Sequence, residues 1–164
     1  MGLTDEKGLA YADSLGRAMQ LTNIARDIKE DAERGRVYIP EDWCRELGLT
    51  HEDILYKHRW DLVAKLAEKL VRRSEDLYKQ GEKGLIYLNF RSAVAVAAAR
   101  FIYAEIGREV LRRGEHAWET RTWIPMRRKI WLACRGFLLV SKSLPQRLLR
   151  RAPFIRIQQV RHFE

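Results

Sequence analysis

One long segment without proline constrains this chain more than any other feature. No proline interrupts the sequence between Asp5 and Ile39, and apolar or small residues recur every three or four positions within it. They are Leu15, Ala18, Met19, Thr22, Ala25 and Ile28. This is the period of an α-helix with one buried face, and Gly35 stands where a residue that ends a helix is expected. The sequence therefore predicts a helix from about residue 5 to residue 33.

The rest of the chain shows the same kind of pattern. No stretch alternates with the period of a strand, and Thr50 with Asp53 resembles the capped start of a brief helix. The segment 93–99 is apolar on every side, which predicts burial from several directions. Gly81 or Gly84 is expected to end the helix that begins near residue 60. An all-α helical bundle follows, with helices at about 5–33, 40–48, 60–81, 91–113 and from 125 onward.

Composition narrows the class of protein. A chain of 164 residues is expected to form one domain. The hydrophobic content of 46% and the charged content of 32% suit a helical protein in water, and no apolar run is long enough to span a bilayer. Cys44 and Cys134 lack the spacing of metal ligands, which favours free thiols in a reducing cytoplasm. We therefore expect a cytoplasmic protein, with peripheral contact to the membrane.

The positive charge is concentrated in the last quarter of the chain. From Arg121 to the end there are eleven Lys or Arg residues and one acidic residue, Glu164, although the whole chain carries only +9. Aromatic and aliphatic residues alternate with these arginines, a composition typical of anionic membrane surfaces. Nucleic acid is the rival partner, but the remainder of the chain is near neutral and shows no nucleic-acid motif. We predict a basic amphipathic tail at 144–164 that follows a bundle at 1–143.

Three oxygen-bearing side chains share one face of the first helix. Asn23, Asp27 and Asp31 are spaced four residues apart, which places neighbours about 6 Å from one another on a helix. Mg²⁺ prefers one or two carboxylates together with substrate phosphates, and the adjacent Arg26 can bind a phosphate oxygen. Two aspartates at this spacing also occur on ordinary solvated faces. The spacing alone therefore leaves both a metal site and a solvated face open.

Longer motifs carry a resemblance to a known family. The segment QLTNIARDIKEDAERGRVYIPEDW, residues 20–43, resembles the second aspartate-rich signature of the squalene/phytoene synthase family, and it is most similar to the phytoene synthase branch. AARFIYAEIG, residues 98–107, resembles that family's tyrosine-bearing helix. RTWIPMRRK, residues 121–129, resembles its R-x-[YFW]-[VI]-P…K segment. The resemblance covers the chain to about residue 140.

The resemblance implies a role for individual residues. Asp27 and Asp31 match a metal-binding aspartate pair, and Asn23 matches an amide beside the same metal, Mg²⁺ or Mn²⁺. Tyr103 matches a tyrosine that faces the reaction cavity, although a tyrosine on an apolar helix is more often a core residue. The implied site consists of catalytic Asp27, Asp31 and Tyr103, substrate-binding Gln20, Asn23, Arg26, Arg36 and Arg121, and metal-binding Asn23, Asp27 and Asp31.

The resemblance also implies a reaction. The family joins two prenyl diphosphates head to head, and its phytoene branch converts two geranylgeranyl diphosphates to phytoene through prephytoene diphosphate, a step of carotenoid biosynthesis. We therefore expect a prenyltransferase of the isoprenoid synthase fold. Squalene or dehydrosqualene synthesis from farnesyl diphosphate remains the alternative within the family. A non-catalytic, membrane-associated or assembly fragment is the alternative of another class.

One expected motif is missing. Enzymes of this family carry two aspartate-rich motifs that face one cavity, and this sequence contains only the second. Its length is also near half of the usual one, which predicts that it corresponds to the C-terminal part of such an enzyme. We expect the N-terminal half of the same enzyme as a partner, and we expect the chain alone to be inactive.

Overall fold

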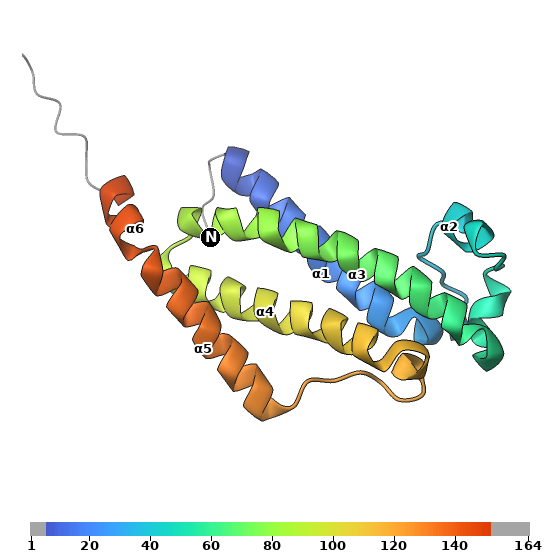
Figure 1. Ribbon diagram of the computed structural model, residues 1–164. Coiled ribbons are helices and arrows are strands. Elements are labelled where there is room, and N and C mark those ends of the chain that lie inside the picture. Colours follow the sequence, from blue (N-terminus) through green and yellow to red (C-terminus); the bar gives the residue numbers. More distant parts are fainter. Residues whose placement is uncertain (1–5, 152–164) are drawn as a thin grey trace, which may run out of the picture.

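The computed structural model describes residues 6–151, and within this range all regular structure is helical (Figure 1). The predicted all-α class is therefore confirmed. Short 3₁₀ helices connect the longer helices at Glu52–Leu55, Lys57–Arg59, Lys83–Tyr87 and Gly114–Trp118. The α-helices are α1 (Glu6–Glu33), α2 (Glu41–Glu46), α3 (Trp60–Glu82), α4 (Phe90–Arg113), α5 (Met126–Lys142) and α6 (Leu144–Arg151).

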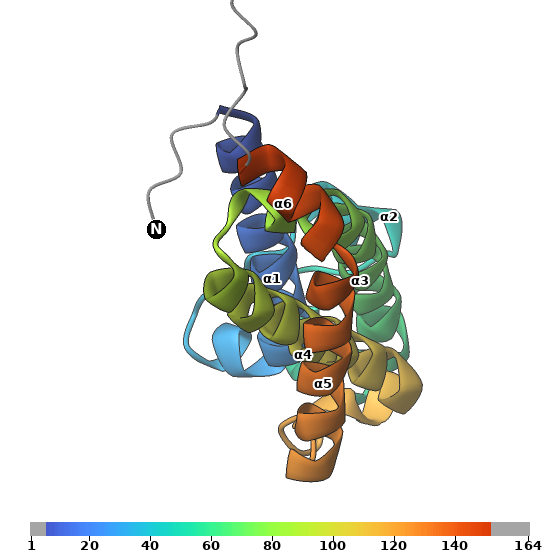
Figure 2. The same ribbon diagram turned by 90° about the vertical axis from the view of Figure 1, so that its left-hand side faces the viewer.

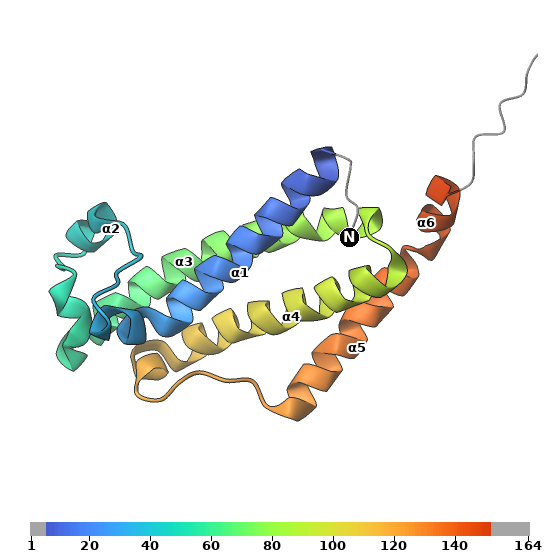
Figure 3. The ribbon, with the colours of Figure 1, turned by 180° about the vertical axis from the view of Figure 1, so that it is seen from behind.

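Three long helices form the body of the molecule. α1 and α3 pack together along most of their length, α4 packs against both, and α5 lies on the side of α4 away from α1 (Figures 1 and 3). α2 and the first 3₁₀ helices close one end of the α1–α3 pair. α5 and α6 follow one another along one side of the molecule (Figure 2).

The core forms because one face of α3 is apolar along its whole length. Trp60, Val63, Leu66, Leu70 and Val71 are all less than 6% exposed, and they pack in one cluster with apolar residues of α1. Each fully buried side chain of this size contributes about 1.5–3 kcal/mol relative to an exposed one. Because Ala25 and Ile28 of α1 belong to this cluster, that face of α1 is buried. The polar residues of α1 therefore lie on its remaining faces.

The glycines have two separate roles. Gly35, Gly48 and Gly114 follow helices with φ of 71°, 66° and 54°, as expected for residues that end helices. α3 ends at Glu82, between the two predicted glycines, but neither Gly81 nor Gly84 has the positive φ of a residue that ends a helix. A Cβ atom at Gly81 would lie 2.9 Å from Cβ of Leu15, so this glycine permits close contact between α3 and α1.

The prediction of burial on every side of 93–99 is correct only in part. Ala93 and Ala97 are buried, whereas Ala95 is exposed. α1, α3 and α5 all pack against α4, and among residues 6–151 no helix covers the side that carries Ala95. α4 and α5 approach so closely that a Cβ atom at Gly136 would lie 2.8 Å from the backbone nitrogen of Ala98.

The structure describes only the first part of the expected basic tail. α6 begins at Leu144, and Arg147 donates hydrogen bonds to the carbonyl oxygens of Leu85 and Leu88 at 2.6 and 2.7 Å. Residues 152–164 of the predicted tail lie outside the described range. None of the helices within residues 6–151 has the length and apolar character needed to cross a membrane.

Candidate functional site

Asp27 lies where the backbone of α1 leaves helical geometry. Its φ of −104° and ψ of 15° belong to a sparsely populated region in which many active-site residues occur. Both carboxylate oxygens accept hydrogen bonds from the neighbouring Arg26, at 2.9 Å to Nε and 2.6 Å to Nη2. The two side chains are 17% and 16% exposed, so solvent screens the pair only in part. The hydrogen bond to Asp27 raises the pKa of Arg26 above its ordinary value, in spite of partial burial.

Arg121 reaches the same carboxylate from a distant part of the chain. Its Nη2 atom lies 3.9 Å from Oδ1 of Asp27. The segment that carries Arg121 is held against α1 by Trp118, whose indole nitrogen donates to the carbonyl oxygen of Ala25 at 3.2 Å. The predicted association of Arg26 and Arg121 with the aspartate motif therefore exists in the fold.

Arg113 holds the segment that presents Arg121. Its guanidinium donates to Oγ1 of Thr122 and Oγ1 of Thr120, both at 3.0 Å, and to the carbonyl oxygen of His116 at 2.9 Å. Sequence reasoning did not identify this residue. An arginine in the last turn of a helix is common, and the sequence carries no signal that its side chain binds the following loop.

Asn23 presents a polar atom without a partner. Its Oδ1 is buried and accepts no hydrogen bond from any group in the described part of the chain. An unsatisfied buried oxygen costs about 1–3 kcal/mol, and such groups in native proteins require an explanation such as an ion or a ligand. Asn23 lies one helical turn before Asp27, so its free oxygen fits a site for a divalent cation.

Asp31 and Arg36 lie at the end of α1. The backbone nitrogen of Arg36 donates to the carbonyl oxygen of Asp31 at 2.8 Å, and the Arg36 side chain is exposed. Burial, and then the negative charge of Asp27, raise the pKa of Asp31 above its ordinary value. Within residues 6–151, no three His, Cys, Asp or Glu side chains converge on a point suited to a metal. Two carboxylates and one amide are nevertheless a donor set that Mg²⁺ uses when phosphates supply the remaining ligands.

Gln20 and Tyr103 flank these residues. Gln20 is exposed, one turn before Asn23 on α1. Tyr103 is half-buried on α4, packs against the cluster of Leu15 and Ala18, and is close enough to Arg26 to interact with it electrostatically. The structure thus gives Tyr103 both a packing role and a position near Arg26.

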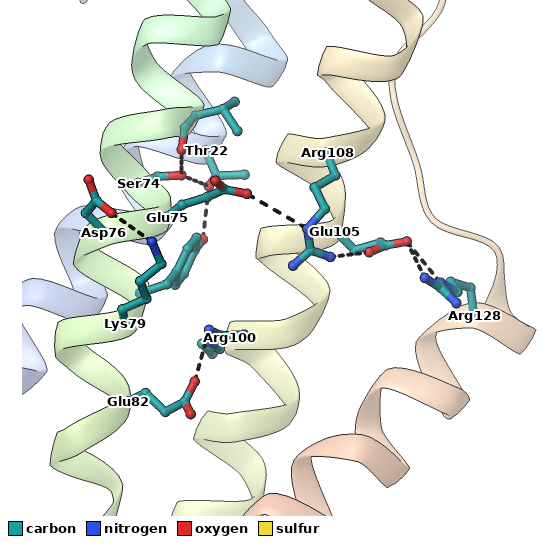
Figure 4. Close-up of polar contacts among 12 residues, drawn as sticks. Thr22, Ser74, Glu75, Asp76, Lys79, Glu82, Arg100, Glu105, Arg108 and Arg128 are labelled. Atoms are coloured by element: carbon teal, nitrogen blue, oxygen red, sulfur yellow. Dashed lines mark hydrogen bonds and ion pairs between the residues drawn. The ribbon is translucent and has the colours of Figure 1, made fainter.

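A buried polar network sets the position of α1 on α3. The hydroxyl of Thr22, next to Asn23, lies 2.9 Å from the hydroxyl of Tyr78 and 3.5 Å from Oγ of Ser74 (Figure 4). Burial raises the pKa of Tyr78 to about 12, so the phenol stays protonated over the physiological range. Because these hydroxyls satisfy one another, they oppose sliding of α1 along α3 and fix the position of Asn23.

Glu105 connects α4 with α5. The carboxylate is 6% exposed and accepts hydrogen bonds from Arg108 at 2.5 Å and from Arg128 at 2.9 Å (Figure 4). Burial disfavours its charged form, but the hydrogen bonds and charges of the two arginines outweigh burial, so the pKa of Glu105 lies below its ordinary value. The contact between Glu105 and Arg128 fixes the start of α5, and thereby the loop before it, which contains Arg121. Sequence reasoning did not single out Glu105.

An apolar groove begins beside the polar residues. It has a volume of about 370 Å³ and lies between α1, the end of α3 and α4, which diverge there (Figure 3). Met19, one turn before Asn23, lines it near the aspartates, and apolar side chains such as Leu15 and Leu88 line it together with several small residues. The small residues include Gly8, Ala12, Gly16, Gly84 and Ala99. The arrangement places the two arginines and the two aspartates at one end of an apolar groove.

The sequence of the chain is similar to those of known proteins. The chain is 40% identical over 155 residues to a 15-cis-phytoene synthase of Enterobacter agglomerans, which covers 93% of this chain and 51% of the relative. It is 42% identical over 145 residues to a phytoene synthase of Pseudescherichia vulneris, covering 87% and 47%. A bifunctional lycopene cyclase/phytoene synthase of Colletotrichum graminicola is 34% identical over 125 residues, covering 74% and 21%.

The chain thus spans about half the length of the bacterial relatives that it matches. The family model described as squalene/phytoene synthase matches residues 1–128, a range that contains the whole aspartate motif, Tyr103 and Arg121. The chain belongs to the squalene/phytoene synthase family.

Proposed function

We propose that this chain carries the second metal- and diphosphate-binding site of a phytoene synthase-type prenyltransferase. The reaction is the head-to-head condensation of two geranylgeranyl diphosphates to phytoene, a step of carotenoid biosynthesis. The observation that supports it best is the buried Oδ1 of Asn23, one turn from Asp27, which accepts no hydrogen bond from any group of residues 6–151. The printed names of the relatives support the same reaction, since they are phytoene synthases.

Asn23, Asp27 and Asp31 would hold Mg²⁺ or Mn²⁺ together with diphosphate oxygens. A bound divalent cation would neutralise the negative charge that develops as diphosphate leaves an allylic carbon. Arg26 and Arg121 bind the remaining oxygens through charge-assisted hydrogen bonds, which strengthen as the charge grows. The site therefore needs no strong general base, because departure of the leaving group is the difficult step.

The groove and Tyr103 act on the hydrocarbon part of the substrate. The groove begins at Met19 beside the polar residues, so a prenyl chain lies along it while its diphosphate contacts Arg26. The apolar walls exclude water that would otherwise capture an allylic cation. The aromatic face of Tyr103 stabilises positive charge at the entrance of the groove.

The first aspartate-rich motif must come from another segment, because this sequence contains only one. We propose that the N-terminal half of the same enzyme type covers the open side of α4 and supplies it. Exposure of Ala95 within the apolar segment 93–99 supports this, since α4 offers an uncovered small-residue surface there.

Product formation from labelled geranylgeranyl diphosphate with Mg²⁺ tests the proposal. The chain is assayed alone and mixed with the N-terminal half of a relative, with Asp27→Ala as the variant and Asp13→Ala, an exposed residue of the same helix, as its control. We expect phytoene only from the mixture and none with Asp27→Ala. Product that persists with Asp27→Ala would refute the assignment. Product from farnesyl diphosphate in preference to geranylgeranyl diphosphate would instead favour a squalene-type reaction.

A further inference from the structure

One face of α5 is apolar and exposed. Five large side chains of this helix are 49–67% exposed, and we call them the outer face of α5. They are Met126, Ile130, Trp131, Phe137 and Leu138. Single exposed apolar residues are ordinary, but a contiguous patch of them marks an interaction surface.

The spacing shows that these residues form one strip. Ile130 follows Met126 by four residues and precedes Phe137 by seven, and Leu138 follows Trp131 by seven. On a helix these spacings give two rows about 100° apart on the same half of α5, with the exposed Arg127 between them. The opposite side carries Leu132, Gly136 and Val140, which are buried against α4. The Phe137 ring lies edge-on against Phe90 of α4, with the ring centroids 6.0 Å apart. No helix among residues 6–151 covers the rest of the strip.

Positive charge borders the strip. Arg127 and Lys142 are exposed near its two ends. The Trp131 ring lies 4.5 Å from the guanidinium carbon of Arg128 and 5.8 Å from that of Arg135. No acidic residue occurs between residue 120 and Glu164, so α5 itself carries only cations and neutral groups, and Glu105 of α4, which binds Arg128, is buried.

We infer that the outer face of α5 binds the surface of an anionic lipid bilayer. A helix of 17 residues is about 25 Å long and can lie parallel to that surface, with its apolar side in the acyl boundary. Trp131, and Trp123 just before the helix at 69% exposure, suit the headgroup level where tryptophan is enriched. Arg127 and Lys142 then contact anionic headgroups.

Other occupants fit this face less well. The aspartate motif and the groove lie between α1 and α4, whereas α5 packs on the other side of α4 (Figures 1 and 3). A partner that completes the site at Asp27 therefore has no need to cover α5. A second copy of the chain would bring two strongly positive segments together, which like-charge repulsion opposes.

Vesicle sedimentation with the 164-residue chain tests the inference. We expect at least about tenfold tighter binding to phosphatidylcholine vesicles with 30% phosphatidylglycerol than to pure phosphatidylcholine, weakened by salt. Arg127→Gln with Lys142→Gln should weaken binding about fivefold per charge removed. Arg45→Gln with Arg72→Gln, exposed residues of α2 and α3, is the matched control and should leave binding unchanged.

The apolar part is tested by Ile130→Ser with Leu138→Ser. We expect at least about a tenfold loss of binding to anionic vesicles, with circular dichroism showing unchanged helix content. Leu9→Ser with Leu55→Ser, exposed leucines outside α5, is the control and should bind like the unchanged chain. Equal binding to neutral and anionic vesicles, or binding that survives both sets of changes in α5, would overturn the inference. A doubled mass in light scattering that Ile130→Ser with Leu138→Ser abolishes would assign the face to a second copy instead.

Discussion

The bidentate pair between Arg26 and Asp27 predicts that metal and diphosphate bind cooperatively. In the protein without ligands, Arg26 occupies both oxygens of a carboxylate that the cation requires. A diphosphate competes for Arg26 and releases Asp27, so each ligand should favour binding of the other. Arg26→Gln removes the competitor, and the metal affinity without diphosphate should therefore increase.

The size of the effect follows from the contact. Hydrogen bonds to charged groups contribute about 1.5–3 kcal/mol, and the pair is mostly shielded from solvent. Metal and water replace part of the contact between Arg26 and Asp27. We therefore take the low end of that range as the free energy needed to displace Arg26 from Asp27. About 1.4 kcal/mol corresponds to a tenfold change in binding. Arg26→Gln should raise the affinity for Mn²⁺ about tenfold without diphosphate, and it should weaken binding of the preformed manganese diphosphate complex.

Mn²⁺ binding is measured by electron paramagnetic resonance, since free and bound ions give different signal amplitudes. The control is Arg17→Gln, which removes an arginine that pairs with Asp13 on the same helix but at an exposed position. Its titration should match that of the unchanged chain. Unchanged or weaker Mn²⁺ binding by Arg26→Gln in the absence of diphosphate would refute the reasoning, because Arg26 would then not compete for Asp27.

Three further changes test other parts of the structure. Asp31→Asn should reduce Mn²⁺ affinity by at least about tenfold, yet raise the melting temperature of the metal-free chain at pH 7. The pKa of Asp31 is raised in the folded state, so the unchanged chain loses stability as the pH rises past the ordinary carboxyl pKa, and the advantage of Asn should vanish in acid. Arg113→Gln should weaken binding of inorganic diphosphate about three- to tenfold, measured by calorimetry, because the loss of one to two hydrogen bonds leaves the Arg121 loop less firmly held. Its Mn²⁺ affinity without diphosphate should stay unchanged. Gly136→Ala should cost about 1–3 kcal/mol in urea unfolding through overpacking on α4, whereas Gly16→Ala, whose Cβ would meet nothing within 4 Å, should stabilise by about 0.5–1 kcal/mol.

Periodicity in the sequence predicted the helices because each buries one continuous face. The same reasoning placed Gly35, Gly48 and Gly114 at helix ends, where positive φ confirms it. The same reasoning did not identify the role of Gly81. This glycine lets α1 approach α3 closely, and a local sequence pattern contains no information about the distance to a second helix.

Some features of the site could likewise be predicted from the sequence, and others could not. The spacing of Asn23 and Asp27 placed their side chains on one helix face, since helical period is a local property, but the resemblance of residues 20–43 to a family signature was needed to identify the aspartate motif. The backbone irregularity at Asp27 and the loop contacts of Arg113 depend on tertiary structure, and no sequence signal marked them. Arg121 was predicted through the family motif alone, and its distance to Asp27 required the fold.

Two contacts that position this site lie within residues 6–151. Thr22 fixes α1 on α3 through Tyr78, and Trp118 fixes the Arg121 loop on α1 through the carbonyl of Ala25. Neither contact depends on a segment that only the longer relatives contain. Binding of metal and diphosphate should therefore be measurable on this chain alone, whereas the condensation requires a second aspartate motif. The two kinds of experiment consequently separate the assembly of the site from the chemistry that we propose for it.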